Sequence, residues 1–316
     1  MAPHRGRASS APHPVPLPAV AGEGNRALAI PRFAILATPC EGRSSRKPGS
    51  RYDPSMRMTI AGLGLVGGSA GMALRRRGWH VAYLDPHVSI EEARAAGAAD
   101  ERVDLLRDTD VVLLATPVDV ALSLMPRIQN ASAITSACSV MAPLRAAATG
   151  TFVAGHPLAG SHRRGLEAAR PDLFEGKPWF VDAEDERVDA MIRDCGGTRE
   201  LVDAARHDAA VALTSHLPQI LSTALAAYLH GREDVLPFAG TGLQTFLRLA
   251  GSDGDVWAPV IDANRANLAP HAEAIAELVR EIIEGDPRAA FARAQALSQE
   301  LAARQPHRSR TTAGDK

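Results

Sequence analysis

The sequence has few of the residues that mark disulfide-rich, metal-binding or highly charged proteins. Its only cysteines are Cys40, Cys138 and Cys195, whose unrelated spacings predict neither a disulfide framework nor a metal site. The formal net charge is −1, so no global basic field indicates a nucleic-acid partner. No apolar run reaches the length of a bilayer span. We therefore expect a protein of the reducing cytoplasm, with neither nucleic acid nor membrane as partner.

The first 55 residues differ in composition from the rest of the chain. They are rich in Pro, Arg, Ser and Ala, poor in acids and without sustained periodicity, so we expect residues 1–55 to be disordered. A basic N-terminus of this kind can be a transit peptide, but it lacks an amphipathic helix. The alternative is a mis-assigned extension, because Met56 or Met58 stands where a dinucleotide-binding domain would begin.

A glycine-rich turn is the most informative feature of the chain. The sequence GLGLVGGS begins at Gly62, follows an apolar strand predicted for Met58–Ala61 and leads into a helix predicted from Gly67 onward. In such a unit Gly62 permits the tight turn, Gly64 lets a pyrophosphate approach the backbone, and Gly67 lets the helix pack closely on the sheet. The unpaired N–H groups at the start of the helix bind phosphate. The pattern predicts a dinucleotide site.

Asp85 indicates which dinucleotide this site prefers. It ends the next predicted strand, His80–Leu84. A carboxylate in that place accepts hydrogen bonds from the adenosine ribose hydroxyls and repels a 2′-phosphate. No Arg follows immediately, since the next residues are Pro86 and His87. We therefore expect NAD rather than NADP.

Strand and helix patterns alternate up to residue 203, which predicts an α/β fold with a parallel, doubly wound Rossmann-type sheet. Residues 204–304 carry apolar residues at helical spacing, with a bend expected at Pro218. We expect residues 56–203 to bind the dinucleotide, residues 204–304 to form an all-helical substrate and dimerisation domain, and residues 305–316 to be a disordered tail. Because these helices carry more apolar surface than a small bundle hides, we expect a homodimer.

His156 is the first candidate for chemistry beyond the nucleotide site. It follows a short strand predicted for Thr151–Ala154, in a predicted loop at the carboxyl edge of the sheet, where ligands of such sheets bind. Pro157 restricts its backbone. An imidazole fixed beside a nicotinamide can accept a proton from a substrate hydroxyl during hydride transfer. The alternative is an ordinary loop histidine.

Taken in order, the motifs of the chain resemble those of the prephenate/arogenate dehydrogenases of tyrosine biosynthesis. They are Gly62 to Ser69, Ala115-Thr116-Pro117, Ser139-Val140, Gly155 to Ser161, Ser215 to Pro218, and Arg248 to Trp257. The resemblance covers residues 58 to about 300. The β-hydroxyacid dehydrogenases share the two-domain plan but not the two histidine motifs, so they fit less well.

The resemblance implies oxidative decarboxylation of a cyclohexadienol carboxylate with NAD, in the family's reference reaction from prephenate to 4-hydroxyphenylpyruvate. It implies that His156 accepts the proton of the ring hydroxyl and that Ser139 bonds the same hydroxyl. It also implies substrate-binding roles for Arg248, which would hold a carboxylate, and for His216 and Gln219. The implied cofactor-binding residues are Gly62, Gly64, Leu65, Val66, Gly67, Asp85, Thr116 and Pro117, and no metal is implied.

Several positions around the substrate depart from the family pattern. They are Cys138, Met141, His162, Gln219, the pair Gln244-Thr245, and Pro259. The departures leave three substrates open: prephenate, arogenate and a 4-amino-4-deoxy analogue. A non-catalytic nucleotide-binding protein on the same fold is a further alternative. The joint presence of His156, Ser139 and Arg248 speaks against it.

Overall fold

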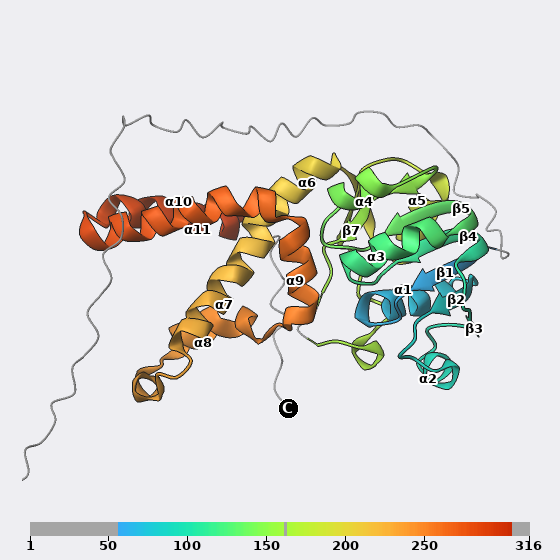
Figure 1. Cartoon of the computed structure of the whole chain (residues 1–316), viewed down its shortest axis with the longest axis horizontal. Helices are drawn as coiled ribbons and strands as arrows, with labels where there is room; N and C mark the ends of the chain where they lie inside the picture. Colours follow the sequence, from blue (N-terminus) through green and yellow to red (C-terminus); the bar gives the residue numbers. More distant parts are fainter. Residues whose placement is uncertain (1–55, 161–162, 305–316) are drawn as a thin grey trace, which may run out of the picture. The chain divides into compact units, whose positions relative to one another are not determined.

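The computed structural model describes residues 56–160 and 163–304. The predicted N-terminal extension, residues 1–55, and the predicted tail, residues 305–316, lie outside the described residues. A region of strands and helices comes first in the described chain, and a purely helical region begins at Ala204 (Figure 1).

The main sheet is parallel and has six strands in the order β3-β2-β1-β4-β5-β6. The strands are β1 Arg57–Ala61, β2 His80–Leu84, β3 Glu101–Arg102, β4 Arg107–Leu114, β5 Gln129–Ser136 and β6 Phe152–Val153. In register, Ile60 of β1 pairs with Tyr83 on one side and Leu113 on the other. The strand order therefore reverses between β1 and β4, which is where such sheets bind nucleotides. The predicted Rossmann-type sheet is confirmed.

Helices cover the main sheet because successive residues of its central strands are buried on opposite faces. Ile60 and Leu113 pack in one apolar cluster, while Ala61 and Leu114 pack in another. The helices of this region are α1 Leu65–Arg76, α2 Ile90–Ala95, α3 Val118–Leu124, α4 Ala142–Ala147 and α5 Glu186–Asp194. Helix α1 begins earlier than the predicted Gly67, since the N–H of Gly68 already bonds the carbonyl of Gly64.

A second, three-stranded sheet carries His156, so the expected loop position is wrong. Strand β7, Gly155–Pro157, pairs antiparallel with β8, Pro178–Val181, which pairs in parallel with β9, Thr198–Leu201. His156 lies opposite Phe180 in this register. A strand of this length is too short for its side-chain alternation to show in the sequence. Strand pairing rather than Pro157 alone therefore fixes the backbone of His156.

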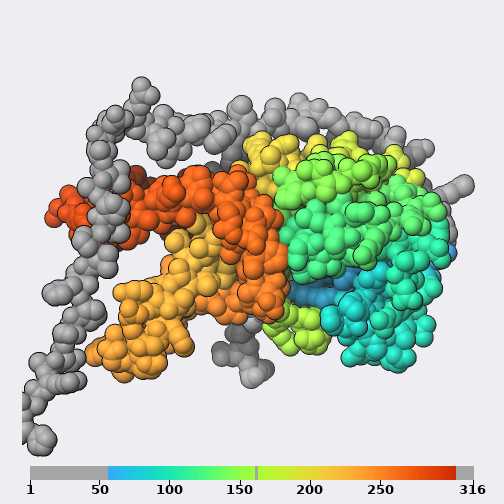
Figure 2. Space-filling view, in the orientation of Figure 1, coloured from blue at the N-terminus to red at the C-terminus, as the bar shows by residue number. Residues whose placement is uncertain are grey.

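The second region is all-helical, as predicted. Its segments are α6 Ala204–Val211, η3 Ala212–His216, α7 Leu217–Leu229, η4 Glu233–Phe238, α8 Thr241–Phe246, η5 Leu247–Gly251, α9 Gly254–Ala263, α10 Arg265–Glu284 and α11 Arg288–Arg304. In Figure 2 the orange surface of this region meets the green surface of the sheet region. Val260 and Trp257 of α9 pack in the apolar cluster that also contains Ala61 and Leu114.

The helix around Pro218 contains a π-helical turn, η3, directly before the proline, instead of the expected simple bend. Proline has no N–H for an i−4 carbonyl and its ring clashes with that carbonyl, so a regular α-helix cannot run through it unchanged. A wider turn relieves this conflict, and such π-bulges are frequent at functional sites. His216 closes the π turn and is only 1% exposed.

The continuous helical stretch Ala204–Leu229 corrects one expectation. It is 26 residues long and reaches a mean hydropathy of 1.2, so by length and composition it could cross a membrane. Yet His207, Asp208 and His216 are buried within it and bonded to other parts of the protein. These bonds build that part of the stretch into the folded chain, and 33% of its apolar window is buried.

Candidate active site

The glycine turn after β1 has the sterics that a dinucleotide site requires. Gly62 has a φ of +89°, and a Cβ there would lie 2.8 Å from the carbonyl oxygen of Ala115. A Cβ on Gly67 would lie 1.9 Å from the carbonyl oxygen of Gly62. A Cβ on Gly64, in contrast, would meet no atom within 4 Å. The first two positions need glycine to fold, whereas the backbone at Gly64 borders open space that a ligand can fill.

The start of α1 and the end of β2 complete the candidate dinucleotide site at the glycine turn. Gly64 precedes α1, no side chain of the described residues caps the helix, and its first turn contains no acid, so its terminal N–H groups are open to phosphate. The carboxylate of Asp85 accepts hydrogen bonds from the backbone N–H groups of Leu63 and His87, each at 2.8 Å. These bonds hold the carboxylate beside the glycine turn. The residues present therefore fit a dinucleotide whose ribose hydroxyls meet Asp85.

A cleft of about 410 Å³ opens at the carboxyl ends of β1, β4 and β5. It brings together six predicted site residues, Gly64, Leu65, Val66, Thr116, Pro117 and Ser139, and is also lined by residues of the helical region that include Ser252 and Trp257. The hydroxyl oxygen of Thr116 is buried and has no hydrogen-bond partner among the described residues. Such a group is rare in a finished fold and suits a polar ligand atom.

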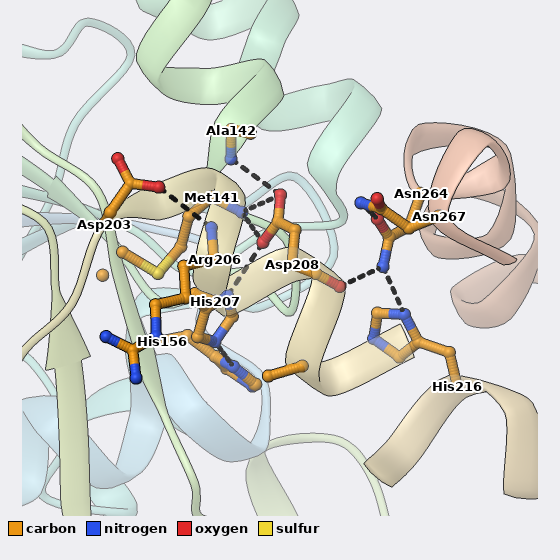
Figure 3. A network of polar contacts seen from close by, with 12 residues as sticks. Met141, Ala142, His156, Asp203, Arg206, His207, Asp208, His216, Asn264 and Asn267 are labelled. Atoms are coloured by element: carbon orange, nitrogen blue, oxygen red, sulfur yellow. Dashed lines mark hydrogen bonds and ion pairs between the residues drawn. The ribbon is translucent and has the colours of Figure 1, made fainter. Parts of the chain in front are cut away.

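A buried chain of polar groups joins the second sheet to the helical region (Figure 3). Nδ1 of His156 lies 2.9 Å from Nε2 of His207, and Nδ1 of His207 lies 2.8 Å from a carboxylate oxygen of Asp208. The two rings meet edge to face, with centroids 5.1 Å apart. No described residue is hydrogen-bonded to Nε2 of His156. This atom is therefore the open end of the hydrogen-bonded network.

The other end of this hydrogen-bonded network reaches the loop that lines the cleft. The carboxylate of Asp208 accepts hydrogen bonds from the backbone N–H groups of Met141 and Ala142, each at 2.8 Å. Met141 follows shortly after Ser139, whose loop lines the cleft. One side chain of the helical region thus fixes the loop that presents Ser139.

Burial keeps both candidate histidines neutral. Desolvation, with a smaller contribution from the positive charges that His207 and His216 carry when protonated, lowers the pKa of His156 to about 3. Desolvation also lowers the pKa of His216 to about 4, with Asp208 opposing and His207 assisting the shift. A neutral imidazole keeps a lone pair on one ring nitrogen, which a proton acceptor requires.

The partners of His216 determine which of its nitrogens carries the proton. The side-chain amide of Asn264 donates to the backbone oxygen of Asp208 at 2.9 Å and to Nδ1 of His216 at 3.1 Å. Because Nδ1 accepts, the proton of the neutral ring is on Nε2. That N–H is buried without a partner among the described residues, and the ring stands edge-on to Trp257 of the cleft. His216 thus offers a donor to a ligand.

The two remaining predicted residues lie on neighbouring segments. Arg248 is exposed on η5 and makes no hydrogen bond or ion pair with the described residues. The buried amide of Gln219 donates to the carbonyl of Leu249 at 2.8 Å and accepts from the hydroxyl of Ser252 at 3.2 Å. Gln219 therefore ties the turn that carries Arg248 to helix α7.

His207, Asp208 and Asn264 carry no predicted role, although the structure places all three at the centre of the network. The sequence does contain an indication that two of these residues, His207 and Asp208, are buried and bonded. His207 and Asp208 are adjacent polar residues near the start of a long, mostly apolar helical stretch, and polar residues are buried only where they find partners. Their partners come from distant segments, so the sequence alone could not name them.

Two family profiles match the chain. One, described as the nucleotide-binding domain of prephenate dehydrogenase, covers residues 70–195, and the other, described as its dimerization domain, covers residues 203–290. The chain belongs to the prephenate dehydrogenase family. The predicted family is therefore confirmed, together with the order of a Rossmann-type domain and a helical domain.

Individual relatives support the same family. NovF of Streptomyces niveus, a probable prephenate dehydrogenase, is 31% identical over 257 residues, which are 72% of this chain and 70% of that protein. The prephenate dehydrogenase of Lactococcus lactis subsp. cremoris is 28% identical over 66% of this chain, and the match spans just under two thirds, 65%, of its own length. The crystal structure of A. aeolicus prephenate dehydrogenase with hydroxyphenyl propionate and NAD+ is 26% identical, with a TM-score of 0.68, covering 81% of this chain and 98% of that one.

Proposed function

We propose that the protein is an NAD-dependent dehydrogenase that oxidatively decarboxylates prephenate to 4-hydroxyphenylpyruvate. The observation that carries the proposal is a neutral imidazole, His156, with an open Nε2, joined through His207 and Asp208 to the loop of Ser139, which lines the cleft beside the glycine turn. Membership of the prephenate dehydrogenase family supports it. We place the enzyme in tyrosine biosynthesis on the same ground, and a cytoplasmic location stays a prediction.

The chain's own residues bind the cofactor and position the substrate. The glycine turn, with the backbone of Leu65 and Val66 at the start of α1, holds the pyrophosphate, and Asp85 holds the adenosine ribose. Thr116 and Pro117 also line the cleft, and the Thr116 hydroxyl, which has no partner among the described residues, can bond the nicotinamide end. Bound NAD supplies the hydride acceptor.

His156 and Ser139 act on the ring hydroxyl of the substrate. Ser139 donates a hydrogen bond to that hydroxyl, and Nε2 of His156 takes its proton as the carbon beneath it is oxidised. Loss of carbon dioxide then makes the ring aromatic. Because aromatisation is strongly favourable, the protein needs mainly to align the ring and polarise one hydroxyl.

Arg248 and His216 hold the acidic parts of the substrate. The guanidinium of Arg248 is unpaired among the described residues and suits a carboxylate, which it can bind through two parallel hydrogen bonds. The Nε2–H of His216 donates to a second oxygen of the substrate. Gln219 contributes by holding the turn of Arg248, since its amide already bonds Leu249 and Ser252.

Arogenate and 4-amino-4-deoxyprephenate are the alternative substrates. The amide of Gln219 stands where family members often have a histidine, so the surroundings of the substrate side chain differ. A relative from Zymomonas mobilis, 28% identical over 247 residues, is named cyclohexadienyl dehydrogenase, which describes a broader substrate class. A non-catalytic nucleotide-binding protein is the remaining alternative.

We also propose that the protein works as a homodimer formed through the helical region. Large apolar side chains are exposed there, among them Tyr228, Phe238, Ile283 and Phe291 at 64%, 89%, 78% and 68% exposure. An apolar groove of about 360 Å³ lies between α10 and α11 and includes Phe291 and Leu297. Surface of this kind marks a protein interface, and the matched profile is described as a dimerization domain.

Reduction of NAD, followed by absorbance, tests the proposed activity. The purified protein is offered prephenate, arogenate and 4-amino-4-deoxyprephenate in separate reactions, with phenylpyruvate, which has no ring hydroxyl, as the control. We expect the highest kcat/KM with prephenate. A higher kcat/KM with either amino compound would reassign the substrate, and no NADH from any of the three would favour the non-catalytic alternative.

A further inference from the structure

The hydrogen bonds around Asp208 determine the proton positions on two histidines in succession. The carboxylate of Asp208 can only accept, so Nδ1 of His207 donates to it and carries the proton. In a neutral His207 ring Nε2 is then an acceptor. Nδ1 of His156 lies 2.9 Å from that atom and must donate to it. His156 therefore carries its proton on Nδ1, and the lone pair of Nε2 is left for the substrate.

A positive charge that remained on the His156 ring would nevertheless be unfavourable. Burial, with a smaller contribution from the positive charges that His207 and His216 carry when protonated, lowers the pKa of this ring to about 3. A proton that arrived from the substrate and stayed there would create an unpaired imidazolium inside the protein, which is costly. The geometry of the site offers a better place for that charge.

His207 is the better place because a carboxylate already contacts it. Its ring and the side chain of Asp208 are each only 2% exposed, and their bonded atoms lie 2.8 Å apart. An imidazolium at His207 would form a buried, hydrogen-bonded ion pair. The other bonds of this carboxylate, from the N–H groups of Met141 and Ala142, stay in place while the charge arrives.

We propose that His207 and Asp208 are positioning residues that extend His156 into a two-histidine proton relay. The proton of the substrate hydroxyl moves to Nε2 of His156, and the Nδ1 proton of His156 moves to Nε2 of His207. His156 ends neutral with its proton on the other nitrogen, and His207 becomes an imidazolium paired with the Asp208 carboxylate. This inference rests on the proposed function, because it takes His156 as the acceptor of the substrate proton.

The proton positions can be measured in the resting protein without any substrate. In a sample labelled with ¹⁵N-histidine, NMR distinguishes protonated from unprotonated ring nitrogens. The signals of His156 and His207 are assigned by their loss in the variants His156→Asn and His207→Gln. We expect both rings at pH 7.5 to be neutral and protonated on Nδ1. A His156 ring protonated on Nε2 would overturn the relay, whatever the enzyme turns over.

His207→Gln separates a relay from a merely orienting contact. The glutamine oxygen can accept the hydrogen bond of His156 Nδ1–H, but a glutamine amide cannot take the proton. We expect kcat to fall about 10²-fold or more, with KM for the substrate changed less than about threefold. His80→Gln, the same change at an exposed residue at the start of β2, is the control and should keep wild-type kcat.

The outcomes separate this inference from the proposed function. An active wild type whose His207→Gln variant keeps kcat within about threefold would overturn the relay and leave the proposed function standing. A wild type that oxidises none of the three candidate substrates would contradict the proposed function, while the NMR measurement still tests the hydrogen-bonded network. Thermal unfolding of His207→Gln checks that a fall in kcat does not come from unfolding.

Discussion

The carboxylate of Asp208, on helix α6, accepts hydrogen bonds from the backbone N–H of Met141 at 2.8 and 3.1 Å. The same carboxylate accepts the N–H of Ala142 at the start of α4. A charge from the helical region thus stabilises the N-terminus of a helix in the sheet region, where the helix dipole favours an anion. The contact fixes the loop of Ser139 relative to His207, so it serves both stability and the site.

Asp208→Ala should destabilise the protein strongly. It removes the acceptor for three buried donors, the N–H groups of Met141 and Ala142 and Nδ1–H of His207, which then lack partners. We expect the free energy of unfolding to fall by about 3 kcal/mol or more, measured by urea denaturation. Asp262→Ala, at an exposed residue that forms an ion pair with Arg265, should change it by less than about 0.5 kcal/mol. Equal effects at both positions would contradict the role of Asp208.

The protein should lose stability as the pH falls from about 6.5 toward 4. The unfolded chain protonates its histidines below their ordinary pKa of 6.5, whereas the folded chain keeps His216 neutral down to about pH 4 and His156 down to about pH 3. The unfolded state therefore binds more protons in this window, which costs stability at up to about 1.4 kcal/mol per pH unit for each histidine.

Urea denaturation at pH 7, 6 and 5 measures this loss. His156→Asn should reduce the change in the free energy of unfolding per pH unit by the contribution of one histidine, because asparagine takes up no proton in either state. His80→Gln, at an exposed histidine, should leave this change per pH unit as it is. A free energy of unfolding that stayed constant from pH 7 to pH 5 would show that the two buried rings are not held neutral.

Asp85→Ser should relax the preference for NAD. The carboxylate is fixed by the N–H groups of Leu63 and His87 beside the glycine turn, where it would repel a 2′-phosphate. We expect the ratio of kcat/KM for NAD to that for NADP to fall at least about tenfold, a free-energy change of about 1.4 kcal/mol. Asp104→Ser removes an exposed charge from a cavity that Asp85 and Asp104 both line and should change the ratio little. A wild type that used NADP as well as NAD would show that Asp85 does not select the cofactor.

Phe291→Glu should weaken the proposed dimer. Phe291 is 68% exposed in the apolar groove between α10 and α11, and a charge there would have to be desolvated on association. Light scattering at micromolar concentration should show a dimer for the wild type and a shift toward monomer for the variant. Leu201→Glu introduces the same charge on β9, at a residue that is 60% exposed, and should leave the dimer intact. A monomeric wild type would contradict the proposal.

The nucleotide half of the site was predictable because its signals are local. Gly62, Gly67 and Asp85 act through backbone conformation and strand ends that lie within one strand–helix–strand unit, so their spacing in the sequence reports their geometry. The order of α/β and all-helical regions was predictable for a similar reason, since hydrophobic periodicity is read over short windows.

The catalytic half was less predictable because its geometry comes from long-range contacts. His156 lies on a short strand whose partner, β8, follows many residues later, so the sequence placed it in a loop. The bond from His156 to His207 spans two regions of the chain, and no local pattern encodes it. The π turn before His216 could be anticipated only as a disturbance near Pro218, not as the rotation that buries the ring.

The last prediction concerns His156 itself. His156→Asn keeps a side chain that can hydrogen-bond the substrate hydroxyl but cannot take its proton. We expect kcat to fall about 10²- to 10⁴-fold, the usual contribution of a general base, with a much smaller change in KM. Arg248→Gln should do the reverse and raise KM more than it lowers kcat, because a carboxylate clamp binds ground state and transition state alike. Steady-state kinetics with prephenate and NAD measures both, and His80→Gln serves again as the control. If His156→Asn kept near wild-type kcat, His156 would be a structural residue of β7. The proton acceptor would then have to be sought elsewhere, with His216, the other neutral histidine of the network, as the next candidate.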